Sequence, residues 1–475
     1  MKVTIQMTIE SDAGEPTWVH EVAQLERGAL RTEALGLTLA EAKSILGNLQ
    51  HTLVEKQASA FLATHRDCSC CGRTLARKGE HDVVIRTLFG KLKLVSPRFY
   101  HCRCQRKRRT SFSPLAELLP GRTSPELLYL ETKWAALMSY GMSVKLLQDV
   151  LPISRDMSTT AVRHDVSWLA DRLDGDLGEE QACFIEGCPR DWDALPEPAT
   201  SLAIGIDGGY VHSRDRTSRQ SGWFEVIVGK CIPSEGSGKC FGLVRRCDKK
   251  PKRRVFELLK SQGMQMNQAV TFLSDGGETV RDLQMYLNPQ AEHLLDWFHV
   301  TMRLTVMGQL VKGLISGVSS LSSGGDGEVP DSAEIQKNLE RIKWNLWHGN
   351  VRRALLLVGD LEADLDAIER PSGAGTKLLR AVREFGGYIT VNQSFIPNYG
   401  DRYHHGERIS TGFVESTVNQ VVSKRFVKKQ QMRWSEWGVH RLLQIRTQVL
   451  NGDWHEKLRG WYPGMTPLSG VELAA

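Results

Sequence analysis

Two short apolar segments that each end in Asp-Gly-Gly constrain the fold of this chain more than any other feature. Residues 202–206 precede Asp207-Gly-Gly, and residues 271–274 precede Asp275-Gly-Gly. Runs of β-branched and aromatic residues that end at a glycine pair predict buried strands, which carry a polar side chain to the rim of a sheet. We therefore expect each strand to end at its aspartate. A lone Asp-Gly-Gly is more often a plain turn. The occurrence of two such motifs after two predicted strands is therefore stronger evidence for a site than either motif alone.

The order of segments from residue 201 predicts one α/β sheet with helices on both faces. Three strands joined by turns come first, and helix and strand then alternate, which is the order of a ribonuclease-H-like core. The expected strands are residues 202–206, 223–232, 240–246, 269–274 and 292–297, and the expected helices lie near 254–259 and 278–287. In that arrangement the first and fourth strands are neighbours, so Asp207 and Asp275 converge.

A third acid, Glu415, lies in a helical pattern far along the chain. An apolar stripe from Val414 to Phe426 marks the helix, and Glu415 stands at its beginning. The nearby Glu407 precedes the expected helix start, so Glu415 is the better candidate. Acids that converge from distant segments suit a pair of hard divalent cations, Mg²⁺ or Mn²⁺, which clamp the attacking and leaving oxygens of a phosphodiester. We expect Asp207, Asp275 and Glu415 to be catalytic metal ligands.

Half of the ten cysteines fall between residues 68 and 104. One group is Cys-Ser-Cys-Cys-Gly and the other is His-Cys-Arg-Cys, on the two sides of a hairpin-like segment. Two such groups predict one tetrahedral zinc. The expected ligands are Cys68, Cys71, Cys102 and Cys104. Cys70 or His101 can replace a neighbour, and reduced structural cysteines are the plain alternative.

The sequence pattern of residues 120–185 predicts three helices. Ser124-Pro125 begins the first, residues 143–150 form the second, and Ser158 caps the third, residues 159–173. The last two resemble a helix-turn-helix, with Arg163 on the exposed face of the candidate recognition helix. An ordinary helix pair is the alternative.

Basic residues are clustered in blocks, although the net charge is only +6. Blocks at 98–109, 245–254 and 424–433 indicate a polyanionic partner, against the alternative of solvated charge runs. The candidate DNA-binding residues are Arg103, Arg106, Lys107, Arg108, Arg109, Arg163, Lys424, Arg425, Lys428, Lys429 and Arg433. No membrane-spanning run and no signal-peptide pattern is present in the sequence, so a cytoplasmic protein is expected.

Several motifs together resemble the DDE transposases of bacterial insertion sequences, specifically the ISKra-type group, over most of the chain. The matching segments are the cysteines at 68–104, Lys133-Trp134, Ile206-Asp207-Gly-Gly, Ser274-Asp275-Gly, Asp296-Trp-Phe-His299, the segment from Ser410 through Glu415 to Gln420, and the segments 428–434 and 442–446. The resemblance implies a metal-binding triad of Asp207, Asp275 and Glu415, supported by Asp296 and His299. The plain alternatives are that Asp296 caps a helix and that the backbone satisfies His299.

The expected organisation is a strand and helix region at 1–60, a zinc-ribbon-like module at 61–112, and a helix-turn-helix-like region at 120–185. A catalytic core at 200–310 plus 408–455 contains a mainly helical insertion at 311–407. Thr38 and Glu41 suggest a helix-capping box in the first region.

The expected function is that of a transposase that binds the ends of its insertion sequence and catalyses Mg²⁺-dependent cleavage and strand transfer. Its partner would be double-stranded DNA, both element ends and target. It would act as a homodimer or higher assembly, in the cytoplasm at the nucleoid. The alternatives are a transposase-derived DNA-binding protein without activity, and a nuclease of the same fold that cuts without joining.

Overall fold

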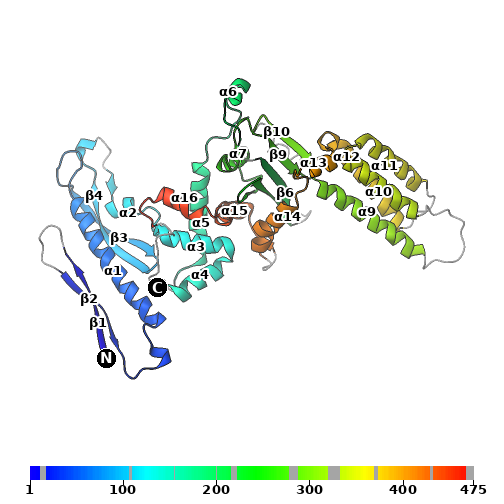
Figure 1. Cartoon of the computed structure of the whole chain (residues 1–475). Helices are drawn as coiled ribbons and strands as arrows, with labels where there is room; N and C mark the ends of the chain where they lie inside the picture. Colours follow the sequence, from blue (N-terminus) through cyan, green and yellow to red (C-terminus); the bar gives the residue numbers. More distant parts are fainter. Residues whose placement is uncertain are drawn as a thin grey trace. The chain divides into compact units, whose positions relative to one another are not determined.

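The computed structural model describes most of the chain, and its α/β class is as expected. The described residues are 1–10, 18–105, 110–153, 156–198, 201–214, 222–277, 287–318, 332–367, 373–427 and 432–466. The chain divides into two compact units, one of Met1–Asp171 with Gly452–Ala475 and one of Arg172–Asn451 (Figure 1). Among the described residues, no helix has the length and apolar character needed to cross a bilayer.

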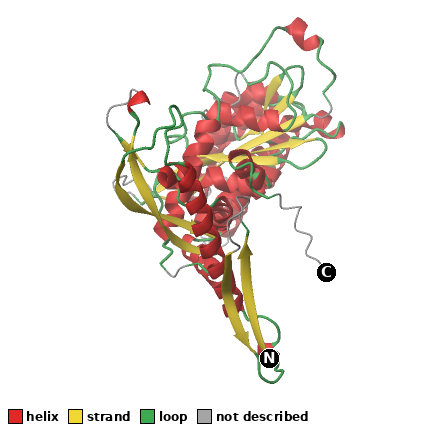
Figure 2. Ribbon diagram, turned by 90° about the vertical axis from the view of Figure 1, so that its left-hand side faces the viewer, coloured by secondary structure: helices red, strands yellow, loops and turns green. Residues whose placement is uncertain are grey.

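The first unit begins with two antiparallel β-structures around a long helix (Figure 2). Its elements are β1 (Lys2–Ile9), β2 (Trp18–Glu26), α1 (Leu39–Thr64), β3 (Arg77–Thr87), β4 (Gly90–Tyr100) and β5 (Ser111–Phe112). β1 pairs with β2, and β3, β4 and β5 form a sheet in that order. The capping box predicted at α1 is present, because the Glu41 amide donates to Thr38 Oγ1 at 3.3 Å and the Thr38 amide donates to Glu41 Oε2 at 2.9 Å.

Helices complete the first unit. They are α2 (Pro114–Leu118), α3 (Pro125–Leu137), α4 (Tyr140–Val150), most of α5 (Thr159–Asp176) and α16 (Trp454–Trp461). α4 begins before the predicted residue 143, because Ser139 caps it by accepting a hydrogen bond from the Met142 amide at 3.3 Å. Ser158 accepts from the Ala161 amide at 3.2 Å, as predicted for the start of α5. The Trp454 indole donates to Thr132 Oγ1 at 3.1 Å and joins α16 to α3.

A five-stranded sheet forms the centre of the second unit. Its strands are β6 (Leu202–His212), β7 (Trp223–Pro233), β8 (Lys239–Leu243), β9 (Val270–Ser274) and β10 (Ala291–Leu295). The order across the sheet is β10-β9-β6-β7-β8, with β6, β7 and β8 antiparallel and β9 and β10 parallel to β6. One face packs on α7 (Pro251–Ser261), and the other packs on α14 (Gly412–Val418), the π-helical η4 (Asn419–Val427) and α15 (Glu436–Asn451).

The first strand departs from the prediction, because β6 continues past Asp207 to His212. Gly208 pairs with Ile227 and Gly209 pairs with Val226 in the antiparallel ladder. The glycine pair therefore does not turn the chain, and Asp207 lies within the strand. β9 ends before Asp275, as predicted. The helix predicted at 278–287 lies outside the described residues except for its last residue.

The described residues between β10 and α14 form a bundle of four long helices, followed by a short segment that leads back to the sheet. They are α9 (Trp297–Val318), α10 (Ser332–Trp347), α11 (Val351–Asp366) and α12 (Gly373–Asn392), and α13 (Tyr399–His404) follows. Each long helix packs on the next and α12 packs on α9, around a shared apolar core. α9 starts directly after β10, so the boundary expected at residue 311 falls inside a helix. The Tyr399 hydroxyl donates to the Leu295 carbonyl at 2.7 Å and fastens the return to the sheet.

Candidate metal centres

The four predicted zinc ligands meet at one end of the β3–β4 hairpin. Their sulfur atoms all lie within 4.8 Å of one another. Cys68 Sγ is 3.5 Å from Cys104 Sγ, and Cys71 Sγ is 3.6 Å from Cys102 Sγ. A tetrahedral zinc with bonds of about 2.3 Å requires sulfur atoms roughly 3.8 Å apart. The cluster therefore has the donors and the spacing for a metal such as zinc.

The local backbone explains why these cysteines converge. The Gly72 amide donates to the Cys68 carbonyl at 2.9 Å, and Gly72 has a φ of +69°, which closes a tight turn. Backbone amides of Cys70 and Cys71 donate to the Cys68 sulfur and lower the pKa of Cys68 to about 6. This favours the thiolate, the form that binds zinc. The two alternative ligands lie elsewhere: Cys70 is exposed outside the cluster, and the His101 ring stacks on Phe112 at 4.8 Å.

A second cluster is made of carboxylates that the strand registers align in one row across the sheet. β6 and β9 pair in parallel up to Gly205 with Leu273, and β9 and β10 pair up to Ser274 with Leu295. Continuing these registers by one or two residues places Asp207, Asp275 and Asp296 in one row across three neighbouring strands. The Asp296 amide donates to the Ser274 carbonyl at 2.8 Å, so the ladder does continue on that side.

Glycines on β6 let the helix that carries Glu415 lie directly on the strand. A Cβ at Gly205 would come within 2.1 Å of Val414 Cγ2, and a Cβ at Gly209 within 3.1 Å of Val418 Cγ1. Residues 205, 207 and 209 share one face of the strand because side chains alternate. Asp207 therefore points to the side on which α14 lies. Glu415 is exposed in the first turn of this helix, next to the buried Val414.

Asp296 is buried and holds the cluster together through four hydrogen bonds. Its Oδ1 accepts from the amides of Phe298 at 2.9 Å and Thr411 at 3.0 Å. Its Oδ2 accepts from the Thr411 hydroxyl and from His299 Nδ1, the latter at 2.7 Å. The bond to Phe298 is the helix cap that the plain alternative predicts. Because both oxygens are occupied, Asp296 positions His299 and the start of α14 and leaves cation binding to the other acids.

The cluster is a single electrostatic group. Burial raises the pKa of Asp207, and the charges of Asp275 and Asp296 raise it further. Glu415 is exposed overall, yet partial desolvation of its carboxyl raises its pKa, and the charge of Asp207 raises it further. Burial alone would lower the pKa of His299, but its bond to Asp296 and the charges of Asp296, Asp207 and Asp275 raise it. Crowded carboxylate oxygens are the ligands that a hard divalent cation binds.

Sequence reasoning missed Thr411, which joins the start of α14 to Asp296. The available signal was a threonine just before a helical pattern, which is typical of a helix N-cap. Nothing local in the sequence indicated that its partner was the aspartate after β10, 115 positions away.

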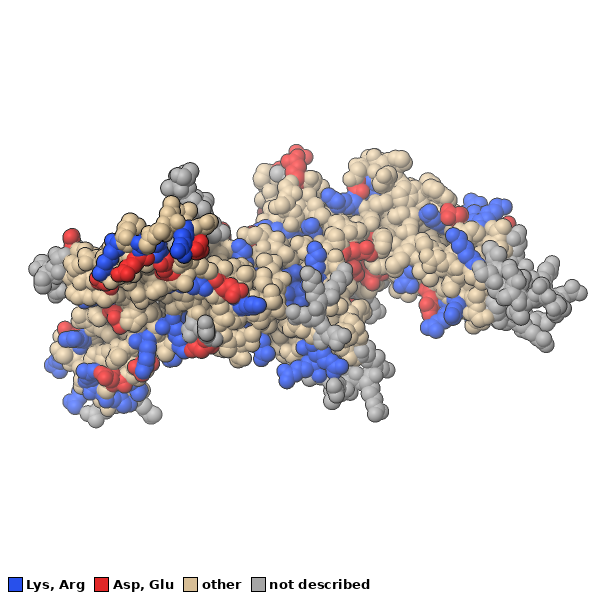
Figure 3. All heavy atoms as spheres, turned by 90° about the horizontal axis from the view of Figure 1, so that it is seen from below, with Lys and Arg blue, Asp and Glu red and all other residues tan. Residues whose placement is uncertain are grey.

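The candidate DNA-binding residues have different environments. Arg103, Arg163, Lys424 and Arg433 are exposed. Arg425 is an exception to the expected basic surface, because it is buried and its guanidinium lies 5.1 Å from the Trp434 ring centroid. Arg106, Lys107, Arg108, Arg109, Lys428 and Lys429 lie outside the described residues. On the face in Figure 3, basic side chains form several groups with acidic side chains between them.

No protein-family model matches this chain, and no curated protein matches it at a significant level. What the two clusters do is therefore inferred from the residues they contain.

Proposed function

We propose that the chain is an enzyme of metal-dependent phosphoryl transfer on DNA, with a ribonuclease-H-like core. More narrowly, we propose an insertion-sequence transposase of the DDE type. The observation that carries this proposal is the alignment of Asp207 and Asp275 just past the end of the parallel pairing between β6 and β9, with Glu415 in the electrostatic field of Asp207. Like charges this close are costly unless a cation joins them.

The order of the strands supports the proposed core. Three antiparallel strands lie on one side of the sheet, and two strands parallel to the first lie on the other. This is the arrangement expected of a ribonuclease-H-like sheet, in which the first and fourth strands carry the acids side by side.

The chain's own residues have distinct roles in the proposed mechanism. Asp207, Asp275 and Glu415 would hold Mg²⁺ or Mn²⁺, with Asp207 as the central ligand, because its charge acts on Glu415 and the charge of Asp275 acts on it. Such ions activate a water or a DNA 3′-hydroxyl and stabilise the departing oxygen. Asp296 holds the Nδ1 side of His299, which leaves Nε2 of the imidazolium to donate to a phosphate oxygen of the DNA.

The proposed reaction has two displacements at phosphorus. In the first, water attacks a phosphodiester at the element's end, and the 3′ oxygen leaves with a proton. In the second, this 3′-hydroxyl attacks a target phosphodiester and gives up its proton, while the target's own 3′ oxygen leaves and takes up a proton. The bond made and the bond broken are of the same kind, so no covalent enzyme intermediate is needed.

The first unit supplies features that suit DNA recognition. The cysteine cluster would hold a structural zinc, and the α4–α5 pair presents the exposed Arg163. A protein that reads double-stranded DNA needs exposed cations for phosphates and a helix for the major groove. Because two element ends must meet, we propose that the protein acts as a homodimer or larger assembly.

A donor plasmid that carries the coding region with its native flanking DNA tests the proposal. With Mg²⁺, the wild-type protein should cut and join this DNA, while Asp275→Asn should lose roughly 10³-fold in rate and keep its DNA binding. Glu407→Gln is the matched control, since Glu407 lies near Glu415 in sequence but pairs with Arg402 at 2.8 Å. Equal products from wild type and Asp275→Asn would overturn the assignment. Cutting without joining would indicate a nuclease, and binding without cutting an inactive DNA-binding protein.

A further inference from the structure

Arg303 on α9 is held in a defined position near the carboxylate cluster. It follows His299 by four residues, so the two side chains lie on one face of the helix. Its guanidinium carbon lies 4.2 Å from the ring centroid of Tyr388 on α12. An arginine over an aromatic ring is fixed in direction, and its N–H donors lie in the plane of the guanidinium.

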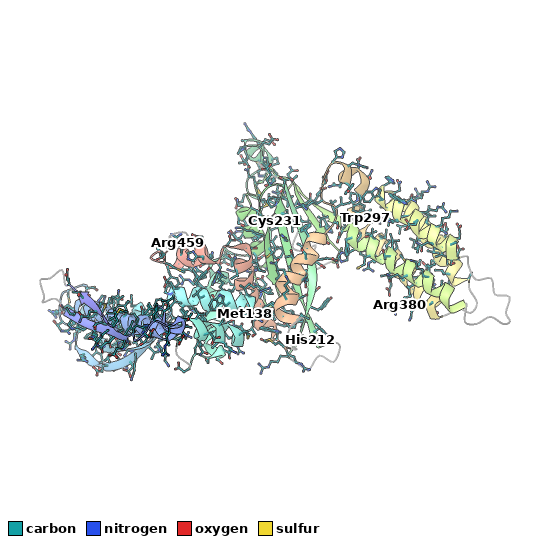
Figure 4. The ribbon with its side chains drawn as sticks, turned by 60° about the horizontal axis from the view of Figure 1, so that its bottom comes forward. Met138, His212, Cys231, Trp297, Arg380 and Arg459 are labelled. Carbon is teal, nitrogen blue, oxygen red and sulfur yellow. The ribbon has the colours of Figure 1, made fainter. Side chains whose placement is uncertain are left out.

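The Arg303–Tyr388 pair is linked electrostatically to the carboxylate cluster. Burial raises the pKa of Tyr388 and the charge of Arg303 lowers it, while the charges of Asp275 and Asp296 raise it, so the phenol lies in the field of these acids. One turn later on α12, the side chain of Asn392 contacts the loop of Asp275, because a Cβ at Gly276 would be 2.4 Å from Asn392 Oδ1. Figure 4 labels Trp297, where α9 begins next to the sheet, and Arg380 farther along the bundle.

Arg303 is exposed, and among the described residues no ion pair involves it. The acids of the cluster act on His299 instead. A fixed arginine with no ion pair among the described residues is suited to an anion brought in with the substrate. The planar guanidinium matches the oxygens of a phosphate.

We propose that Arg303, oriented by Tyr388, binds a backbone phosphate of the DNA strand next to the phosphate that is cut. This inference rests on the proposed function and extends it, because it makes the α9–α12 face of the helical bundle part of the substrate-binding surface. Tyr388 acts only as a positioning residue. In this proposal the helical bundle places the positively charged guanidinium of Arg303 beside the metal ligands at the edge of the sheet.

The test measures the binding of full-length protein to duplexes from the flanking DNA, with Ca²⁺ in place of Mg²⁺. Each duplex carries one uncharged methylphosphonate, at successive positions around the cut. For the wild type, one position should weaken binding about tenfold. Arg303→Ala should bind the unmodified duplex about tenfold more weakly and be insensitive at that position. For Arg303→Ala, the slope of log affinity against log salt concentration should decrease by about the amount that one phosphate contact contributes.

Two further variants separate phosphate binding from a structural role. Arg303→Lys keeps the charge and should retain part of the affinity, and Tyr388→Phe keeps the ring and should behave as wild type. Arg380→Ala is the matched control, because Arg380 is exposed on α12 and paired with Glu384 at 2.8 Å. The inference is wrong if Arg303→Ala responds to every methylphosphonate as Arg380→Ala does. A protein that contacts DNA through Arg303 but never cuts it would instead refute the proposed function.

Discussion

Asp296 decides how two groups of the candidate active site are oriented. It binds His299 on one oxygen and Thr411 on both, so it fixes an imidazolium and the helix that carries Glu415 at once. A carboxylate with every acceptor in use is a poor metal ligand but a strong organiser. This separates its role from those of Asp207 and Asp275, which lie at the same level of the sheet.

The first prediction concerns Asp296→Asn. The negative charge that raises the pKa of His299 is removed, so His299 should lose its proton at lower pH than in wild type. The alkaline limb of kcat against pH should therefore move to lower pH, with kcat reduced and KM for DNA little changed. Thr411→Val should reduce kcat without moving that limb. An unshifted limb in Asp296→Asn would show that His299 does not act as the charged group.

The second prediction concerns Glu131 of α3, which is fully buried close to Asp165. Burial, and then the neighbouring Asp165, raise the pKa of Glu131 well above its usual value. An acid whose pKa is higher in the folded than in the unfolded state destabilises the fold least at pH values below its unfolded pKa, where it is protonated in both states. The free energy of unfolding then falls as the pH rises from the unfolded pKa towards the folded pKa. Glu131→Gln should therefore raise Tm at pH 8 and change it little near pH 4.

Thermal unfolding of Glu131→Gln at the two pH values measures this difference. About 1 kcal/mol corresponds to roughly 2–4 °C in Tm for a unit of this size. A lower Tm at pH 8 than the wild type would mean that the charged carboxylate is needed in the folded state, contrary to the burial argument.

At the scale of elements, the contact between β6 and α14 sets the position of Glu415. The third prediction is that Gly205→Ala destabilises the protein by about 1–3 kcal/mol, because the added methyl overlaps Val414. The helix must shift, so cleavage should fall more than DNA binding does. Gly359→Ala is the matched control: it lies exposed in α11 with open space around it, and it should stabilise by about 0.5–1 kcal/mol. Denaturant unfolding of both variants measures these changes, and equal effects would contradict the packing argument.

The fourth prediction concerns the ribbon of β3 and β4. The wild-type protein should contain one zinc per chain in the cysteine cluster, as measured by atomic emission. Cys71→Ser should lose this zinc and lower the stability of the first unit, since ligation of a structural zinc contributes folding energy. Cys70→Ser should keep the zinc, because Cys70 lies next to Cys71 in the same turn but outside the cluster. Loss of zinc in Cys70→Ser and retention in Cys71→Ser would assign the ligands differently.

Across the whole molecule, local patterns predicted the order of strands and helices, while several contacts between distant segments were not predicted. The apolar runs before Asp207 and Asp275 predicted their strands, and the cysteine spacing predicted the ligand cluster. The extension of β6 to His212 was missed, because Gly208 and Gly209 suggest a turn unless the partner strand β7 is known. The burial of Arg425 was also missed, since it depends on packing against Trp434.

The two units divide the proposed work between recognition and chemistry. The first contains the cysteine cluster and the α4–α5 pair, and the second contains the carboxylate cluster and the helical bundle. Loss of zinc should therefore weaken recognition of DNA ends without altering the residues that bind the catalytic cations.

The most direct test of the central claim, that the carboxylates form one cation site, is a titration of zinc-loaded protein with Mn²⁺ in the presence of flanking DNA, followed by electron paramagnetic resonance. The account predicts two tightly bound Mn²⁺ ions per wild-type chain. Asp207→Asn should lose both, while Asp275→Asn and Glu415→Gln should each lose at least one. Equal Mn²⁺ binding by the wild type and all three variants would contradict the account.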